Sequence, residues 1–168
     1  MSNSTRDQFN DLLRSEGLNA GIIPVSNIPN EESRLNEVNR LGILNRDLDQ
    51  EAQYNALTQL AAIITKSQIG LINILGSNIQ QCKTNFGFNV LESTLTEEMP
   101  REISICQYSL ASPQEPLIIN DLFLDERTKH FKKLEAYENL RFYAGSPLIS
   151  SRGFSIGTLC VIDDKPKK

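Results

Sequence analysis

The sequence contains a single histidine, His130, among its 168 residues. Because imidazole is the commonest metal ligand, one such residue excludes a histidine-rich metal centre. Catalysis by a serine, histidine and aspartate triad would also have to depend on this one side chain. Lysines stand at positions 129 and 132, so we expect His130 to face solvent rather than to bind a haem.

Cysteine is scarce as well, and Cys82, Cys106 and Cys160 lie far apart in the chain. An odd number of cysteines at wide spacing does not predict a disulfide framework. The sequence has no Cys-x-x-Cys pair, which disfavours a zinc site. We interpret Cys106 and Cys160 as buried thiols that act as small hydrophobic groups. A redox role would need two of the three thiols to lie close together in space.

An excess of positive charge is missing too, because 17 Lys and Arg residues face 21 Asp and Glu residues, for a net charge of -4. A surface that binds nucleic acid needs a basic excess, so we expect no nucleic-acid partner. No apolar run approaches the roughly 18 residues of a membrane span. The polar N-terminus has no signal-peptide core. We therefore expect a cytoplasmic protein without a membrane partner, or the cytoplasmic part of a longer one.

The residues that are present suit one domain with a sizeable core, since 39% of them are hydrophobic. Residues 1–32 are interpreted as an N-terminal segment, with one amphipathic turn before Gly17 and an extended linker through Pro24 and Pro29. Residues 33–168 are interpreted as the folded domain. Helices are predicted over 33–44 and 49–66, the second with Leu57, Leu60 and Ile64 on one face.

Several short strands follow these helices along the chain. The run IGLINIL at 69–75 is apolar except for Asn73, which predicts a central strand covered on both faces. A more polar strand returns over 79–85, residues 87–98 are interpreted as a loop, and residues 101–110 as a short strand or the start of a helix. Further strands are predicted in LIIND and in the hairpin of residues 141–163, with a helix in the intervening segment 124–140. This order predicts an α+β fold.

Six motifs occur in order along this framework, and together they resemble a known family. They are LGILN at 41–45, IGLINIL at 69–75, PREISIC at 100–106, PLIINDLFLDER at 116–127, RFYAGSPL at 141–148 and GFSIGTLCVIDDKPK at 153–167. Over residues 34–167 the chain resembles the GAF domain, in the branch found N-terminal to bacterial kinases, cyclases and phosphodiesterases. The resemblance implies a central antiparallel sheet of about six strands with helices on its faces.

The resemblance also implies a function and a set of partners. GAF domains of this branch are sensors that bind a small molecule in a pocket beside the sheet, or only dimerise, and regulate a signalling effector. The chain is therefore expected to be a homodimer without catalysis of its own, next to a kinase, cyclase or phosphodiesterase. Cyclic nucleotides, bilins, haem and small metabolites are the ligand classes that the resemblance offers, and the cofactor stays unknown.

We expect a ligand to lie between the sheet and the segments 104–108 and 121–131, with residues 141–143 at its edge. The candidate ligand-binding residues are Ser104, Cys106, Tyr108, Asp121, Phe131, Arg141, Phe142 and Tyr143. Arg141 offers a two-pronged donor for an anion, and the alternative is an ion pair with Asp121 or Asp163. A second alternative is a pocket that Phe131 and Phe142 fill.

Two departures from the patterns of related domains bear on the ligand. Cys106 is followed by Gln107 and Tyr108, so the histidine that accompanies covalent bilin attachment is missing. The pair Asp125 and Glu126 matches part of a cyclic-nucleotide signature, but Asp121 stands where that signature has phenylalanine. Both departures weaken the corresponding ligand assignments.

An enzyme is the alternative to a sensor. Free methionine sulfoxide reductases are built on a lone GAF fold of similar length and use cysteine thiolates around the pocket. Three cysteines make this function conceivable here, although their placement does not match the pattern of that family.

Overall fold

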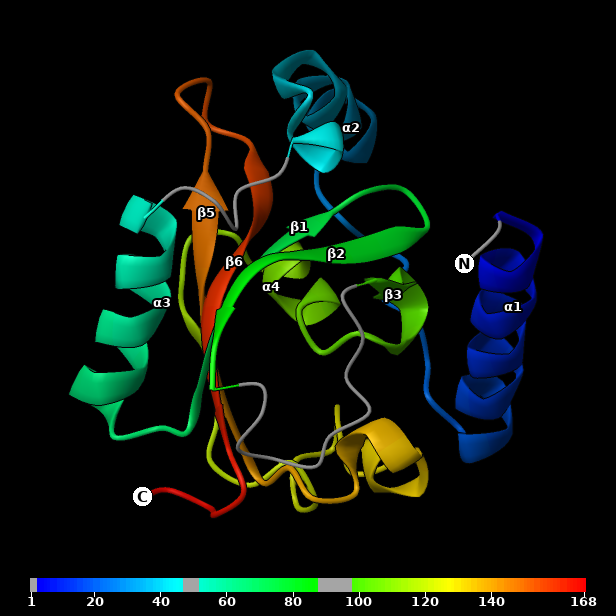
Figure 1. The fold of residues 1–168 in the computed structure, drawn as a ribbon. Helices are drawn as coiled ribbons and strands as arrows, with labels where there is room; N and C mark the ends of the chain where they lie inside the picture. Colours follow the sequence, from blue (N-terminus) through cyan, green and yellow to red (C-terminus); the bar gives the residue numbers. More distant parts are fainter. Residues whose placement is uncertain (1–2, 47–51, 88–97) are drawn as a thin grey trace.

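A six-stranded antiparallel sheet forms the centre of the computed structural model, which describes residues 3–46, 52–87 and 98–168. The strand order is β3-β2-β1-β6-β5-β4, and every neighbouring pair is antiparallel (Figure 1). The strands are β1 Ile69–Leu75, β2 Ile79–Phe86, β3 Glu98–Pro100, β4 Leu117–Ile119, β5 Phe142–Ile149 and β6 Ser155–Asp163. This architecture confirms the fold that the sequence predicts.

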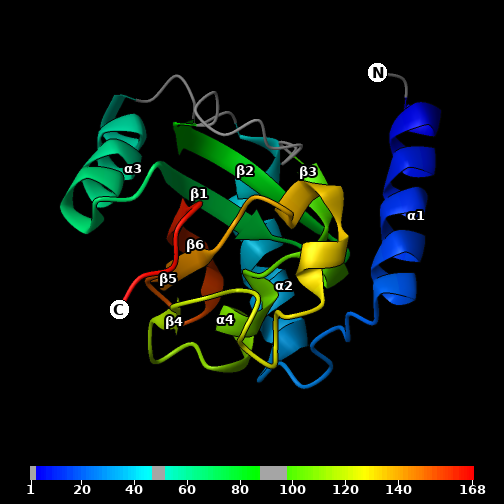
Figure 2. The ribbon, with the colours of Figure 1, turned by 90° about the horizontal axis from the view of Figure 1, so that it is seen from below.

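Helices and irregular segments cover both faces of the sheet, as Figures 1 and 2 show. Helix α3, Ala52–Thr65, packs against β1, β2 and β6 on one face. The other face carries the short helix α4, Gln107–Ala111, and the single turns η2 Arg101–Ile103, η3 Phe131–Lys133 and η4 Glu135–Tyr137. Helix α2, Glu31–Leu41, contacts β6 and leads into η1, Ile43–Asn45. Helix α1, Asn3–Ala20, lies beside β3 and η2.

Burial follows the predicted roles of the strands. All seven residues of β1 are buried, so the apolar run is covered on both faces as predicted. The β5–β6 hairpin turns at Gly153, whose φ of 84° favours glycine. At Gly157 a Cβ atom would collide with the main-chain carbonyl of Asn73 in β1, so the missing side chain lets β1 and β6 approach closely. Pro147 lies inside β5, beyond the residues of β5 that pair with β4.

Helix α3 packs against the sheet with a different face from the one that the sequence predicted. Thr58 and Ala62 are its buried residues. Leu57, Leu60 and Ile64, which the spacing placed toward the core, are largely exposed. Small side chains let a helix approach a sheet closely, which explains why this face was selected over the bulkier one. The predicted helix also began at residue 49, and residues 49–51 lie outside the described ranges.

Two other segments differ from the predictions. The N-terminal segment forms an 18-residue helix rather than one turn, and Gly17 lies inside it against Ile103. Segment 124–140, predicted as a helix, contains only the turns η3 and η4. Its backbone is diverted by side chains, because Asp121 accepts the N–H of Phe123 and Thr128 donates to the carbonyl of Leu122. Such local bonds compete with helix formation.

The remaining predictions concern residues 87–110. Residues 101–110 begin as the turn η2 and continue into α4, so the helical alternative holds there. The loop predicted for 87–98 falls mainly on residues 88–97, outside the described ranges, and Glu98 begins β3. Among the helices that the structure describes, none has the length and apolar character of a membrane span.

Candidate functional site

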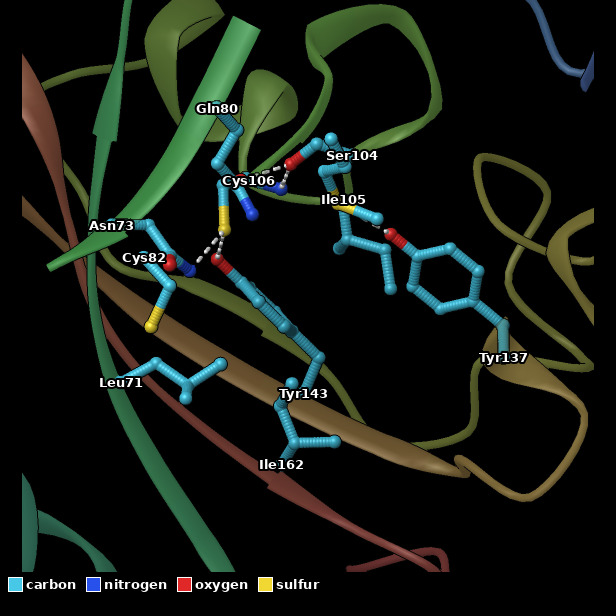
Figure 3. A pocket seen from close by; sticks show the side chains of 11 residues that line it. Leu71, Asn73, Gln80, Cys82, Ser104, Ile105, Cys106, Tyr137, Tyr143 and Ile162 are labelled. Atoms are coloured by element: carbon cyan, nitrogen blue, oxygen red, sulfur yellow. Dashed lines mark hydrogen bonds between the residues drawn. The ribbon is translucent and has the colours of Figure 1, made fainter. Parts of the chain in front are cut away.

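A small cavity lies between the sheet and the segment that runs from β3 to α4 (Figure 3). The sheet contributes side chains from β1, β2, β3, β5 and β6, while Ser104 to Cys106 and Tyr137 come from the irregular segments. The polar and thiol groups around it are Asn73, Gln80, Cys82, Ser104, Cys106 and Tyr143. In the part of the chain that the structure describes, no Lys, Arg, His, Asp or Glu side chain lines this cavity.

Asn73 is a polar side chain at the centre of the sheet, opposite Thr158 of β6, and it is 1% exposed. The pairing of β1 with β2 shifts by one residue between Ile72 and Asn73, and such bulges re-aim a side chain. Its amide nitrogen donates to the sulfurs of Cys106 and Cys160, at 3.4 and 3.5 Å. Its Oδ1 is buried and has no hydrogen-bond partner among the described residues. Asn73 therefore keeps one strong acceptor unused inside the cavity.

Tyr143 of β5 also contacts the sulfur of Cys106, which Asn73 contacts from β1. Its hydroxyl group donates to the sulfur of Cys106 at 3.3 Å (Figure 3). The ring lies along the strand over Gly145, where a Cβ atom would collide with it. Burial raises the pKa of Tyr143 well above its ordinary value. The phenol therefore stays protonated at neutral pH and acts as a hydrogen-bond donor.

The two buried thiols of this site, Cys106 and Cys160, influence each other. The neighbouring thiol of Cys160 lowers the pKa of Cys106 to about 6, helped by Thr158, Tyr143 and Asn73 and opposed by burial. The same contact and burial raise the pKa of Cys160 well above its ordinary value. Cys106 therefore ionises first, because it receives most of the hydrogen bonds that stabilise a thiolate.

A network of hydrogen bonds holds the wall of the cavity opposite the sheet. The hydroxyl of Ser104 accepts the backbone N–H of Cys106 at 3.0 Å and donates to Oε1 of Gln80. The hydroxyl of Tyr137 donates to the carbonyl of Ile103 at 2.8 Å. These bonds fix the turn that carries Cys106, so the thiol is held in place by side chains rather than by a strand ladder.

The size and chemistry of the cavity limit what it can do. Its volume is about 20 Å³, which is the room that a single water needs. Its lining offers neutral donors, one unused amide oxygen and thiols. Among the residues that the structure describes, no cluster of His, Cys, Asp and Glu could hold a metal ion. The site thus suits a small uncharged molecule, or the uncharged part of a larger one.

The structure gathers three of the sequence-predicted site residues around this cavity, namely Ser104, Cys106 and Tyr143. Tyr108 lies outside it, where its hydroxyl donates to the carbonyl of Arg127 at 2.9 Å. Phe131 is buried in the main core, where its ring meets that of Tyr137 edge to face at 4.9 Å. Neither Tyr108 nor Phe131 therefore lines the cavity that holds the thiols.

Arg141 and its neighbours lie farther from the cavity. The guanidinium of Arg141 donates to both carboxylate oxygens of Asp121, at 3.0 and 2.6 Å, and lies over the ring of Phe123. Arg141 therefore makes the ion pair that the sequence offered as the alternative to an anion site. Phe142 alternates with Tyr143 along β5, and its ring packs under the ammonium of Lys167.

The cavity is also lined by Asn73, Gln80 and Cys82, which were not among the site residues predicted from the sequence. Asn73 carried a usable signal, because it is the only polar residue in the apolar run IGLINIL. A lone amide in a two-sided buried strand must find partners in the core, so it marks a polar site. Gln80 and Cys82 alternate along a strand of mixed polarity and carried no comparable signal.

A larger surface groove of about 700 Å³ lies outside the sheet, between segment 21–27 and residues 126–130. Tyr108 and His130 contribute to its walls. Gly21 sits against the imidazole ring of His130, so the histidine contacts the N-terminal segment.

Comparisons with known proteins place these features in a family. Residues 49–168 match the GAF domain. Over 137 residues the chain is 29% identical to a cyclic di-GMP phosphodiesterase of Pseudomonas aeruginosa. The match covers 82% of this chain and 22% of that protein, so the chain spans about a fifth of its relative.

Solved structures show the same fold at lower identity. A type II free methionine-R-sulfoxide reductase from Thermoplasma acidophilum superposes with a TM-score of 0.53 at 16% identity, over 68% of this chain and 74% of that one. The GAF domain of an Acinetobacter phosphoenolpyruvate-protein phosphotransferase gives 0.52 at 14% identity, over 86% and 82%. The family match covers more than half of the residues, and the chain belongs to the GAF domain family.

Proposed function

We propose that this GAF domain is a sensor that binds a small molecule in the cavity at Asn73 and regulates an attached or partner signalling effector. The observation that carries the proposal is the unused Oδ1 of Asn73, buried at the centre of the sheet. A buried acceptor without a partner costs about 1–3 kcal/mol. A ligand that donates a hydrogen bond to this oxygen recovers that cost, and the recovered free energy favours ligand binding at this site.

The lining of the cavity supports an uncharged ligand. Its polar groups are two amides, a hydroxyl, two phenols and thiols, and Arg141 is already paired with Asp121. A cyclic nucleotide would have to keep its phosphate outside, because a buried anion needs a cation or several donors. A ligand larger than water must displace the wall at Ser104–Cys106, which is a turn held by side-chain bonds. Cyclic nucleotides, haem, bilins and neutral metabolites therefore remain the panel to test, with neutral metabolites favoured.

An effector domain is proposed as the partner of this sensor. The matching phosphodiesterase is several times longer than the match, which is the arrangement expected of a regulatory domain joined to a catalytic one. A kinase or a cyclase in the same position would be regulated in the same way. The cytoplasmic location expected from the sequence stays a prediction.

We also propose that the domain forms a homodimer through α3. Leu57, Leu60, Ile63 and Ile64 of this helix are 47–70% exposed. The helix contains no charged residue between Ala52 and Thr65, so two copies could meet without burying or repelling charge. Helix α2 is less suited to this contact, because it buries Arg34, Glu37 and Val38 against its own domain.

A methionine sulfoxide reductase is the second candidate. The observation in its favour is that Cys82 and Cys106 line one cavity, with Cys160 beside them. As for any sensor ligand larger than water, the volume of about 20 Å³ means that an amino acid would have to displace the wall at Ser104–Cys106. Against the enzyme stands the placement of the three cysteines along the chain, which does not match the pattern of that family. Thiol titration with an assay of methionine sulfoxide turnover distinguishes the two functions, and turnover that disappears in Cys106→Ser would establish the enzyme.

The sensor is tested by thermal shift with the ligand panel named above. A ligand at 100 times its dissociation constant should stabilise the fold by about 2.7 kcal/mol. The shift should disappear in Asn73→Leu, which removes the amide, and persist in Asn139→Leu, an exposed position. A panel without any shift, or a shift that survives in Asn73→Leu, would contradict the proposed site.

A further inference from the structure

The three cysteines, widely separated in the sequence, come together around one cavity. Cys82 and Cys106 line it, and the amide nitrogen of Asn73 lies 3.4 and 3.5 Å from the sulfurs of Cys106 and Cys160. Each of these two thiols also shifts the pKa of the other, so Cys106 and Cys160 are neighbours. The pair brings β6 together with the turn before α4.

The two buried thiols of this pair have different surroundings. Cys106 faces the hydroxyl of Tyr143 and the amide of Asn73, both of which donate to its sulfur. These donors stabilise a thiolate, and the pKa of Cys106 lies below its ordinary value while that of Cys160 lies above it. One thiol is thus prepared as a nucleophile, and its neighbour keeps its proton.

The size of the cavity selects the molecule that can reach the thiolate. About 20 Å³ accommodates one water-sized molecule, and hydrogen peroxide is only slightly larger than water. Free methionine sulfoxide and bulky hydroperoxides do not fit. Cys82 also lines the cavity and is only partly buried, unlike Cys106 and Cys160.

We propose that Cys106 and Cys160 form a redox-active thiol pair, in which hydrogen peroxide oxidises Cys106 and Cys160 then closes a disulfide. The Cys106 thiolate attacks one peroxide oxygen, the O–O bond breaks, and the departing hydroxide takes a proton from solvent to become water. The Cys160 sulfur next attacks the sulfenic acid, an S–S bond forms, and the S–O bond breaks. The hydroxyl group leaves with the thiol proton as a second water, so two electrons pass from the thiols to the peroxide.

The fold permits the movement that this bond requires. Cys160 is fixed in the central strand β6, whereas Cys106 sits on a turn held by Ser104. Closing the disulfide pulls this turn toward the sheet and breaks the bond between Cys106 and Tyr143. The oxidised site therefore differs from the reduced one in the wall that a ligand would have to displace.

Peptide mapping tests the identity of the pair. The full chain is treated with hydrogen peroxide, its remaining thiols are blocked, and disulfide-linked peptides are identified by mass spectrometry. We expect a link between Cys106 and Cys160 in the wild type and in Cys82→Ser. In Cys160→Ser the reaction should stop at a sulfenic acid on Cys106. This sulfenic acid is detected by labelling it with dimedone. A link from Cys106 to Cys82, or an unmodified Cys106, would overturn the proposal.

A rate measurement tests the surroundings of Cys106. Tyr143→Phe removes one donor to the sulfur and should slow peroxide oxidation about tenfold, with a higher thiol pKa measured by thiolate absorbance. The matched control is Tyr108→Phe, whose hydroxyl bonds to Arg127 outside the cavity. Hydrogen peroxide should also react at least about tenfold faster than tert-butyl hydroperoxide, because of the cavity volume. Equal rates for the two tyrosine variants, or for the two oxidants, would contradict the mechanism.

This inference does not depend on the sensory function. Peroxide chemistry at Cys106 can be measured on the domain alone, without a ligand or an effector. Conversely, a ligand that shifts the melting temperature through Asn73 would support the sensor even if Cys106 proved inert. The two proposals therefore fail by different experiments.

Discussion

Arg141 and Asp121 form a bidentate ion pair that joins the start of β5 to the turn after β4. The carboxylate of Asp121 also accepts the backbone N–H of Phe123 at 3.0 Å. The guanidinium lowers the pKa of Asp121, which shows that the pair favours the charged carboxylate. This contact gives Arg141 a structural role, whether or not an anion also approaches it.

Removal of Arg141 should therefore lower stability without abolishing ligand binding at Asn73. We expect Arg141→Ala to reduce the melting temperature by about 2–4 °C, the shift expected for a modest loss in a domain of this size. Asp121→Asn should lower it too, and the double variant should lose less than the two single losses combined. Additive losses in calorimetry would show that the two residues act independently.

Acid should destabilise the domain partly through Glu37. Its carboxylate is buried and pairs with Arg40 at 2.8 Å and Arg152 at 3.2 Å, and Arg40 lowers its pKa to about 2. A pKa lower in the folded than in the unfolded state contributes stability above the unfolded value, near 4.3. That contribution is lost as pH falls from about 4 to 2.

The acid prediction is checked by urea unfolding between pH 6 and about 2.5. Glu37→Gln cannot titrate at this position, so its stability should fall less steeply below about pH 4 than that of the wild type. Glu32→Gln is a suitable control, because Glu32 is exposed on the same helix. If the free energy of unfolding falls equally steeply below about pH 4 in the wild type and in Glu37→Gln, the carboxylate of Glu37 does not cause the loss of stability in acid.

The sequence specified the sheet well because its signals are local. Alternation, the turn at Gly153 and the buried run of β1 determine strands from adjacent residues alone. The orientation of α3 could not be obtained in this way. Its bulky apolar residues satisfy the spacing of a core-facing helix, but the sheet accepts the smaller face with Thr58 and Ala62.

The sequence predicted only those residues of the candidate site that lie both in a recognised motif and at the cavity beside the sheet. Cys106 and Tyr143 were selected and do meet across the cavity. The contact of Asn73 with two sulfurs depends on a bulge in β1, and the sequence does not reveal a shift in strand register. Likewise, whether Arg141 faces a ligand or Asp121 depends on the path of the turn between β4 and η3.

Gly157 should be intolerant of a side chain, because a Cβ atom there would collide with the carbonyl of Asn73. Gly157→Ala must push β1 and β6 apart, which overpacks the core and should destabilise the fold by about 1–3 kcal/mol. Gly153→Ala meets open space but requires a φ of 84°, so its cost should be close to about 1 kcal/mol. Urea unfolding of both variants checks the order, and a smaller loss at Gly157 would contradict it.

The exposed apolar face of α3 leads to the last prediction, which concerns the oligomeric state. Leu60 is 52% exposed in the middle of this face. If two copies meet there, Leu60→Glu places a buried charge at the centre of the interface, where it has no partner. Analytical ultracentrifugation should then show a monomer in place of the dimer, while the circular dichroism spectrum stays unchanged.

Gln59→Glu is the matched control for this prediction, because it adds the same charge at the neighbouring exposed position of α3. It should leave the dimer intact, since a charge at the rim of an interface stays hydrated. A wild type that sediments as a monomer at every concentration would refute the dimer. A dimer that survives Leu60→Glu would instead place the interface on another surface, because an unpaired buried carboxylate is too costly for this one to remain closed.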